Sequence, residues 1–261
     1  MITITCRSIL ASTALLFTLL PSAAAAQEPD FRVLNLPSTL TLPVRASNFE
    51  LTHRFNGNLR RGSLGENAGD LFGLDQGAVV GFEYRFGIAR HLQAAVYRTG
   101  FDKTIQIHGK YDAVRQRGPF PVALSAVFSV EGADNLRKRY SPAAGLIVSR
   151  IVARKVAVYA TPVWVHNTAA LLGVDRDTLL IGIGGRLRVR STVYIVAEVS
   201  PRASGYRPDK AAYGFAIEKQ AGGHLFQLNV GNSQGTTFAQ IARGGFPDSL
   251  YLGFNLARKF F

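Results

Sequence analysis

Apolar and polar residues alternate one for one along most of this chain, and that period constrains its fold more than any other feature. Phe82, Tyr84 and Phe86 fall on one face of an extended chain, and Glu83 and Arg85 fall on the other. This alternation is typical of a β-strand with one apolar face, whereas an amphipathic helix would place apolar residues three and four apart. About twelve segments follow the pattern: residues 46–56, 77–86, 91–99, 103–112, 121–131, 142–150, 155–165, 178–188, 192–200, 212–219, 224–231 and 249–260.

The length of these segments favours a membrane barrel. Most have about nine to eleven residues, which is what a tilted strand needs to cross the hydrocarbon core. An even number is expected when both ends of a single-chain barrel lie on one side of the membrane. We therefore predict an all-β fold, a single antiparallel up-and-down transmembrane β-barrel of about twelve strands. The alternative is a secreted β-sandwich or lipocalin-like barrel.

The connections between the segments alternate in length, as the long loops and tight turns of outer-membrane barrels do. A soluble sandwich gives no reason for such an alternation. The longer connections are 57–76, 132–141, 166–177, 201–211 and 232–248, the shorter ones are 87–90, 151–154, 189–191 and 220–223, and the pair 100–102 and 113–120 departs from the rule. Both ends of the barrel are then expected on the short-turn side.

The first 26 residues resemble a secretory signal peptide. Arg7 precedes an apolar stretch too short to span a bilayer, and small residues lead to a predicted cleavage near Ala26 and Gln27. The chain's one cysteine, Cys6, lies before the apolar stretch and so does not make a lipoprotein signal. We expect a Sec-exported protein whose mature part contains no disulfide and no thiolate chemistry.

The last strand ends on aromatic residues, as the closing strands of outer-membrane barrels do. We expect Phe254, Leu256, Phe260 and Phe261 to belong to the strand that closes the barrel against the first one. Because successive side chains of a strand point to opposite faces, Phe260 falls in the lipid-facing row and Phe261 falls outside it. Together with the signal peptide, this strand predicts the cell outer membrane as the location.

The chain divides into three parts on this interpretation. Residues 1–26 are the signal peptide, residues 27–45 form an arm in the periplasm or in the lumen, and residues 46–261 form the barrel domain. The arm and the loop 57–76 are the two segments expected to be able to fill the lumen.

The chain also resembles an uncharacterised outer-membrane β-barrel family, catalogued as a domain of unknown function. The resemblance implies a barrel fold, carries over no activity, and departs from the family pattern around residues 231–238. The matching motifs are Asp70-Leu71-Phe72-Gly73-Leu74-Asp75 with Ala78 and Phe82-Glu83-Tyr84, His53-Arg54-Phe55, Lys110-Tyr111 with Arg115-Gln116, Pro162 with His166-Asn167, Gly182-Ile183-Gly184-Gly185-Arg186, Gly222 to Leu228 with Asn232-Ser233, and Gly253 to Arg258.

Removal of Arg7 with the signal leaves 29 Lys and Arg against 17 Asp and Glu. An exported barrel makes nucleic acid an unexpected partner in spite of this charge. The expected partners are outer-membrane lipids, whose phosphates the basic connections would meet, and the barrel-assembly machinery. The alternative, more specific interpretation of the basic residues is that they attract small anionic solutes toward a pore.

Ten charged or titratable residues point to the lumen by parity. A charge facing lipid is costly, at about 2–4 kcal/mol for a mid-plane Arg, so these groups must be paired or hydrated inside. The candidate lumen-lining residues are Glu50, Arg54, Glu83, Arg85, His108, Lys110, Glu131, Arg186, Glu198 and Glu218.

Two functions remain open at this stage. The first is a passive pore or transport-related barrel with a mixed-charge, net-basic lumen and loops. The second is a non-conducting structural or partner-binding barrel. An interfacial lipid enzyme acting through His166 or His224 is a third and weaker hypothesis, because neither His has a Ser placed two residues after it. We expect no catalytic, cofactor-binding or metal-binding residues.

Overall fold

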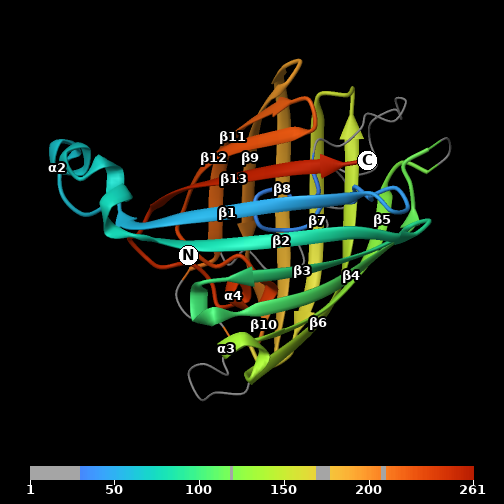
Figure 1. Ribbon diagram of the computed structural model, residues 1–261, viewed down its shortest axis with the longest axis horizontal. Helices are drawn as coiled ribbons and strands as arrows, with labels where there is room; N and C mark the ends of the chain where they lie inside the picture. Colours follow the sequence, from blue (N-terminus) through green and yellow to red (C-terminus); the bar gives the residue numbers. More distant parts are fainter. Residues whose placement is uncertain (1–29, 118–119, 169–176, 207–209) are drawn as a thin grey trace, which may run out of the picture.

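The computed structural model describes residues 30–117, 120–168, 177–206 and 210–261, and the predicted signal peptide lies outside these ranges. Within them, twelve long strands form a closed antiparallel barrel (Figure 1). The strands are β1 (Ser47–Asn58), β2 (Ala78–Ala89), β3 (Leu92–Thr99), β4 (Ile105–Val114), β5 (Ala123–Gly132), β6 (Lys138–Val152), β7 (Val156–Val165), β8 (Thr178–Arg190), β9 (Val193–Ser200), β11 (Ala212–Ala221), β12 (His224–Gly231) and β13 (Tyr251–Phe260).

Each strand pairs with its neighbours in sequence, and the last pairs with the first. Ser47 lies opposite Phe260 and Leu51 opposite Leu256, so β13 closes the barrel against β1. A short additional strand, β10 (Arg202–Ser204), extends the edge of β8 beyond its pairing with β9. The predicted architecture is confirmed, and the twelve expected segments coincide with the observed strands to within a few residues.

Burial alternates along the strands as the sequence pattern predicts. On β2, Gly81, Glu83 and Arg85 are buried, whereas Phe82 and Tyr84 are exposed at 46% and 53%. The exposed row carries Phe, Leu, Ile, Val and Tyr around the barrel wall, which is the surface that lipid requires. The buried row carries most of the charge of the strands.

The connections separate into two ends. Short turns join β2 to β3, β6 to β7, β8 to β9 and β11 to β12, and the free ends of β1 and β13 lie at this end. The longer connections at the other end carry helical turns, which are α2 (Leu64–Gly69), η1 (Leu71–Gln76), η2 (Phe101–Lys103), α3 (Ala133–Leu136) and α4 (Phe238–Ala242). No helix in the described ranges is long and apolar enough to cross a membrane.

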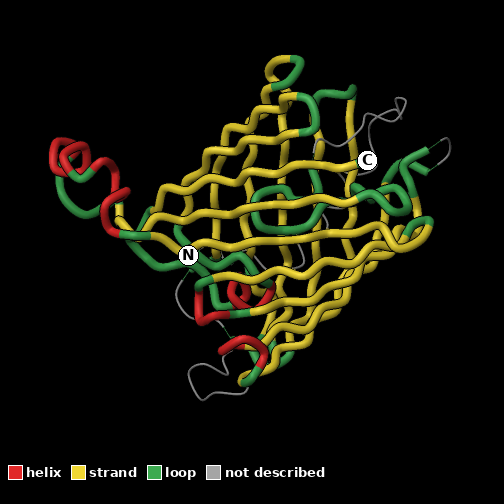
Figure 2. The backbone as a smooth tube through the Cα atoms, in the orientation of Figure 1, coloured by secondary structure: helices red, strands yellow, loops and turns green. Residues whose placement is uncertain are grey.

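Residues 30–42, called the hairpin arm below, fold back on themselves inside the barrel. Arg32 pairs with Pro37, the amide of Val33 donates to the carbonyl of Leu36 at 2.8 Å, and the amide of Ser38 donates to Phe31 at 2.8 Å. The loop enclosed by the strands in the centre of Figure 2 belongs to this arm. Of the two positions expected for residues 27–45, the described part of the arm therefore occupies the lumen.

The connection of residues 232–250 also folds inward, which the sequence did not indicate. All five residues of α4 are buried, and a capping box of Thr237 and Gln240 begins the helix. The expectation that loop 57–76 could fill the lumen is wrong, because its helix α2 has no buried residue and projects from the end of the barrel (Figure 1).

Candidate functional site

The ten residues predicted to line the lumen are all buried, and none exceeds 7% exposure. A side chain on the wall of a water-filled channel would be accessible to solvent, so these side chains border protein and not bulk water. The arm and the 232–250 loop supply that protein.

Arg32 of the hairpin arm joins the acidic groups of two neighbouring strands. Its Nε lies 3.1 Å from Glu50 Oε2 on β1, and its Nη2 donates to Glu83 on β2. Glu83 also accepts from Arg85 at 2.5 Å, so two cations and two carboxylates form one buried cluster. His108 Nε2 lies 3.9 Å from Glu83 at its edge.

The tip of the arm binds a carboxylate through its backbone. The amides of Leu34, Asn35 and Leu36 donate to the same oxygen, Oε2 of Glu198 on β9, at 3.1, 3.1 and 3.0 Å. Three consecutive amides around one anion form a nest, which satisfies donors that would otherwise be buried without partners. Arg54 on β1 donates to the side-chain oxygen of Asn35 at 3.0 Å, so the tip is held from both sides of the barrel.

Strands β8, β12 and β13 hold the outgoing leg of the arm through its carbonyl groups. Arg186 donates to Arg32 O at 2.8 Å and pairs with Glu218 at 3.0 Å, while Gln227 donates to Val33 O at 2.9 Å. Asn255 donates to Leu34 O at 3.1 Å. These contacts use side chains to replace the ladder partners that the arm lacks.

The returning leg contacts the opposite wall. Lys110 on β4 donates to the carbonyls of Ser38 and Leu40 at 2.9 and 2.5 Å. The amide of Leu42 donates to Gln93 on β3 at 3.0 Å, and Thr39 contacts Ser149 on β6 at 2.6 Å. Because the arm bonds to strands all around the barrel, it lies across the lumen and not along one side.

Glycines on β8 and β11 make room for the tip. A Cβ atom on Gly182 would lie 2.0 Å from Leu36 Cδ1, and one on Gly214 would lie 2.4 Å from Leu34 Cδ2. The glycine-rich motif at residues 182–186 therefore has a packing role toward the arm, in addition to the strand packing or curvature that the sequence predicts.

The 232–250 loop meets the arm from the other end. Glu131 on β5 accepts from Thr237 Oγ1 at 2.7 Å and from the amide of Ala239 at 3.1 Å, which fixes the start of α4. Phe238 and Ile241 then pack with Leu36 of the arm in one buried apolar cluster. That cluster covers the inner faces of β5 to β8, where the lumen wall is apolar.

The two inserted segments enclose a small cavity where they meet. A cavity of about 10 Å³ lies among Arg32, Arg85, His108, Thr236 and Phe238, and other side chains complete its lining. This volume is close to the least that can hold a single water. A solute larger than water therefore has no room at this point unless one of the inserted segments moves.

The other predicted residues lie on the closing strand and at the two ends of the barrel. Phe254, Leu256 and Phe260 are on β13 with partly exposed side chains, and Phe261 follows the strand at 83% exposure. His166 pairs with Asp177 at 2.7 Å near the long-loop end, whereas His224 begins β12 at the short-turn end. Sequence reasoning missed the role of Arg32 and the inward course of the α4 loop, because the apolar run of the arm and the capping box indicate structured segments but not where those segments lie.

Comparisons with known proteins agree with this fold. A family model described as a membrane bound beta barrel domain (DUF5777) matches residues 29–260. No curated protein matches the chain. The NanC porin in a rhombohedral crystal form superposes with a TM-score of 0.53 at 7% identity, covering 82% of this chain and 100% of the porin.

The KdgM porin superposes with a TM-score of 0.50 at 10% identity, covering 83% of this chain and 99% of the porin. A second KdgM structure, in complex with disordered oligogalacturonate, gives 0.49 at 8% identity, over 83% of this chain and 99% of that one. At these identities the likeness extends to the fold of small porins and no further.

Proposed function

Because this chain belongs to the membrane bound beta barrel domain family (DUF5777), we propose that it is an integral, non-enzymatic barrel of the outer membrane whose lumen is closed at rest by the hairpin arm and the α4 loop. The observation that carries this proposal is the burial of all ten lumen-facing charged or titratable residues behind these two segments. A resting barrel of this kind does not conduct.

The contacts of the arm support a stable closed state. Breaking a buried ion pair by removing one partner costs about 3–5 kcal/mol, and Arg32 has two carboxylate partners. The nest around Glu198 adds three charge-assisted hydrogen bonds. Spontaneous withdrawal of the arm is therefore a rare event.

A gated passive pore is the second candidate, and the course of the arm favours it. Both legs of the arm run to the short-turn end, where residues 43–46 lead into β1, so the hairpin can leave the lumen without unthreading through the barrel. Withdrawal would uncover a wall of mixed charge on β1 to β4 and β8 to β11. The porin fold of NanC and KdgM supports this candidate by analogy alone.

Recordings in planar bilayers test the proposal. We expect the purified full-length barrel to be silent and a variant lacking residues 27–42 to show discrete conductance. A matched deletion of residues 64–69, which contribute no buried residue, should stay silent. Steady conductance of the full-length protein, equal to that of the arm deletion, would contradict a closed resting state.

A further inference from the structure

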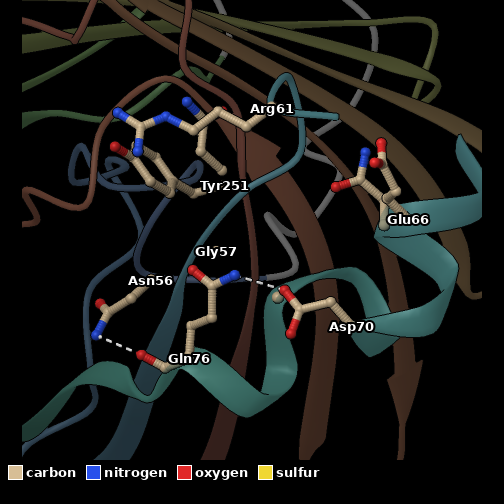
Figure 3. A pocket seen from close by; sticks show the side chains of 10 residues that line it. Asn56, Gly57, Arg61, Glu66, Asp70, Gln76 and Tyr251 are labelled. Carbon is tan, nitrogen blue, oxygen red and sulfur yellow. Dashed lines mark hydrogen bonds between the residues drawn. The ribbon is translucent and has the colours of Figure 1, made fainter. Parts of the chain in front are cut away.

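A polar pocket lies outside the lumen, at the long-loop end of the barrel. Its volume is about 440 Å³, within the usual range of small-molecule sites. The end of β1, the 59–77 loop and the start of β13 form its walls (Figure 3). Its lining residues are Asn56, Gly57, Asn58, Arg61, Glu66, Asn67, Asp70, Gly73, Gln76 and Tyr251.

The loop that forms the pocket is fixed on β1 by two glycines in contact. A Cβ on Gly57 would lie 2.2 Å from Gly73 Cα, and Gly73 itself has φ +83°. Gly73 therefore requires glycine for two separate reasons, the close approach and the left-handed backbone. It belongs to the motif Asp70 to Asp75, which the closed lumen does not explain and which here sets one wall of a preformed pocket.

The amide side chains of the pocket are mostly used by the fold. Asn56 donates to Gln76 O at 3.2 Å and accepts from Gln234 at 2.8 Å. Asn58 donates to Ser249 at 3.1 Å and accepts from the amide of Leu250 at 3.0 Å. Side chains with their donors and acceptors already committed are poor partners for the many hydroxyls of a neutral sugar.

Charged groups on opposite sides hold the capacity that remains, because among the described residues Asp70 accepts only from Gln76 at 2.5 Å and Glu66 only from Ser63 at 2.5 Å, each through one oxygen, Oδ2 and Oε2. Arg61 and Tyr251 lie on one side in Figure 3, and Glu66 and Asp70 lie on the other. Within the described ranges Arg61 forms no ion pair, whereas its neighbour Arg60 lies 4.0 Å from Asp248 and donates to Tyr213. Hydrogen bonds with the backbone and side chain of Ser63 lower the pKa of Glu66, which is therefore ionised at neutral pH.

We propose that this pocket binds a small zwitterion of amino-acid to short-peptide size, with its carboxylate at Arg61 and its ammonium group at Glu66 and Asp70. The planar guanidinium offers paired donors to a carboxylate, and the two carboxylates offer acceptors to an ammonium group. The proposal does not depend on whether the barrel conducts.

Calorimetric titration of the folded full-length barrel with four probes tests this assignment. The probes are dialanine, N-acetyl-dialanine without the ammonium charge, dialanine amide without the carboxylate, and maltose as a neutral sugar. We expect saturable binding of dialanine, and binding about tenfold or more weaker for each blocked peptide, because each loses a charge-assisted contact. Maltose should not compete.

Variants with matched controls test which residues bind the carboxylate end of the ligand and which bind its ammonium end. Arg61→Met should abolish the preference for dialanine over its amide, while Arg60→Met should preserve it. Asp70→Asn should reduce the preference over the N-acetyl peptide, while Asp75→Asn, on the same loop outside the pocket, should not. The heat-dependent electrophoretic shift of a folded barrel shows that each variant folds. Tighter binding of maltose than of dialanine, the absence of saturable peptide binding, or equal losses in Arg60→Met and Arg61→Met would overturn the proposal.

Discussion

Arg32 balances the charge of the lumen from a position outside the barrel strands. It neutralises Glu50 and Glu83 together, and its side chain is about 5% exposed. Its guanidinium also lies 4.9 Å from the centre of the Tyr97 ring, which adds a cation–π contact to the two ion pairs. A single arm residue thus bridges the one carboxylate of β1 and the one carboxylate of β2.

Replacing Arg32 by Met should release the arm. The change leaves two buried carboxylates without their shared cation, at a cost of about 3–5 kcal/mol to the docked state. We expect proteinase K to remove residues 27–42 from the folded variant at least about a hundredfold faster than from the wild type. Arg45→Met, at an exposed position after the arm, is the control; equal resistance of the Arg32 and Arg45 variants would show that the ion pairs do not hold the arm.

Substitution of Gly182 tests how the tip of the hairpin arm packs against β8. Gly182→Val should displace Leu36, because even a Cβ atom there would lie 2.0 Å from Leu36 Cδ1. Gly185→Val is the matched control, since a Cβ at that position meets nothing closer than Ala157 O at 4.0 Å. Hydrogen exchange of the amides of residues 33–36 measures the effect: faster exchange is expected in the Gly182 variant alone, and protection unchanged in both variants would refute the packing role.

At the scale of single residues, the sequence is informative where the period of two applies. Parity alone indicated Glu50, Glu83, Arg85 and Lys110 as lumen residues, because one face of a membrane strand must be apolar. The same reasoning could not reach Arg32, which lies in a hairpin with no period of its own. It also could not show that the glycines at 182 and 184 face side chains of the arm.

The hairpin arm and the α4 loop are elements that the barrel strands enclose but do not pair with. The arm uses side-chain partners on β1, β3, β4, β8, β9, β12 and β13, and α4 rests on Glu131 and on the apolar inner faces of β5 to β8. Strand positions were predictable because the bilayer imposes their length and their alternation of apolar residues. Whether a loop folds into the lumen could not be predicted, because this depends on contacts between residues far apart in the chain.

A disulfide between the arm and β6 should lock the closed state. The side-chain oxygens of Thr39 and Ser149 lie 2.6 Å apart, so cysteines at both positions are within reach of a disulfide. The chain's one cysteine, Cys6, lies in the predicted signal peptide and would not interfere. We expect Arg32→Met with Thr39→Cys and Ser149→Cys to be silent in planar bilayers when oxidised and to conduct after reduction.

The control proteins carry Arg32→Met with only one of the two cysteines, Thr39→Cys or Ser149→Cys. They should conduct with or without reductant. Conductance that persists in the oxidised double-cysteine protein would mean that ions pass by a route that the arm does not block.

The whole barrel carries its charge unevenly between its two ends. Eleven Lys and Arg residues lie in or next to the short turns and the chain ends beside them: Arg45, Arg90, Arg115, Arg117, Arg154, Lys155, Arg188, Arg190, Lys219, Arg258 and Lys259. In the described ranges the acidic residues near this end, Asp30, Asp112 and Glu218, are buried. At the long-loop end, by contrast, acidic and basic residues are mixed.

This asymmetry should favour anionic phospholipid at the short-turn end, where each exposed cation contributes about 1 kcal/mol near such a surface. We expect Arg90→Gln with Arg154→Gln and Arg190→Gln to reduce the phosphatidylglycerol that native mass spectrometry detects on the detergent-extracted barrel. The control replaces Arg137, Lys138 and Arg139, at the other end, by Gln. Equal losses in the two triple variants would show that the position of the charge is unimportant.

The location of the arm inside a closed cylinder sets an order of assembly. Asn255 on the last strand donates to Leu34 of the arm, and the last strand is also the one that seals the wall against β1. A hairpin held on nearly every side is more readily enclosed by strands that wrap around it than inserted into a finished cylinder. The arm would then serve as a core around which the strands assemble, and a barrel made without it should reach the same fold but pair β13 with β1 more slowly.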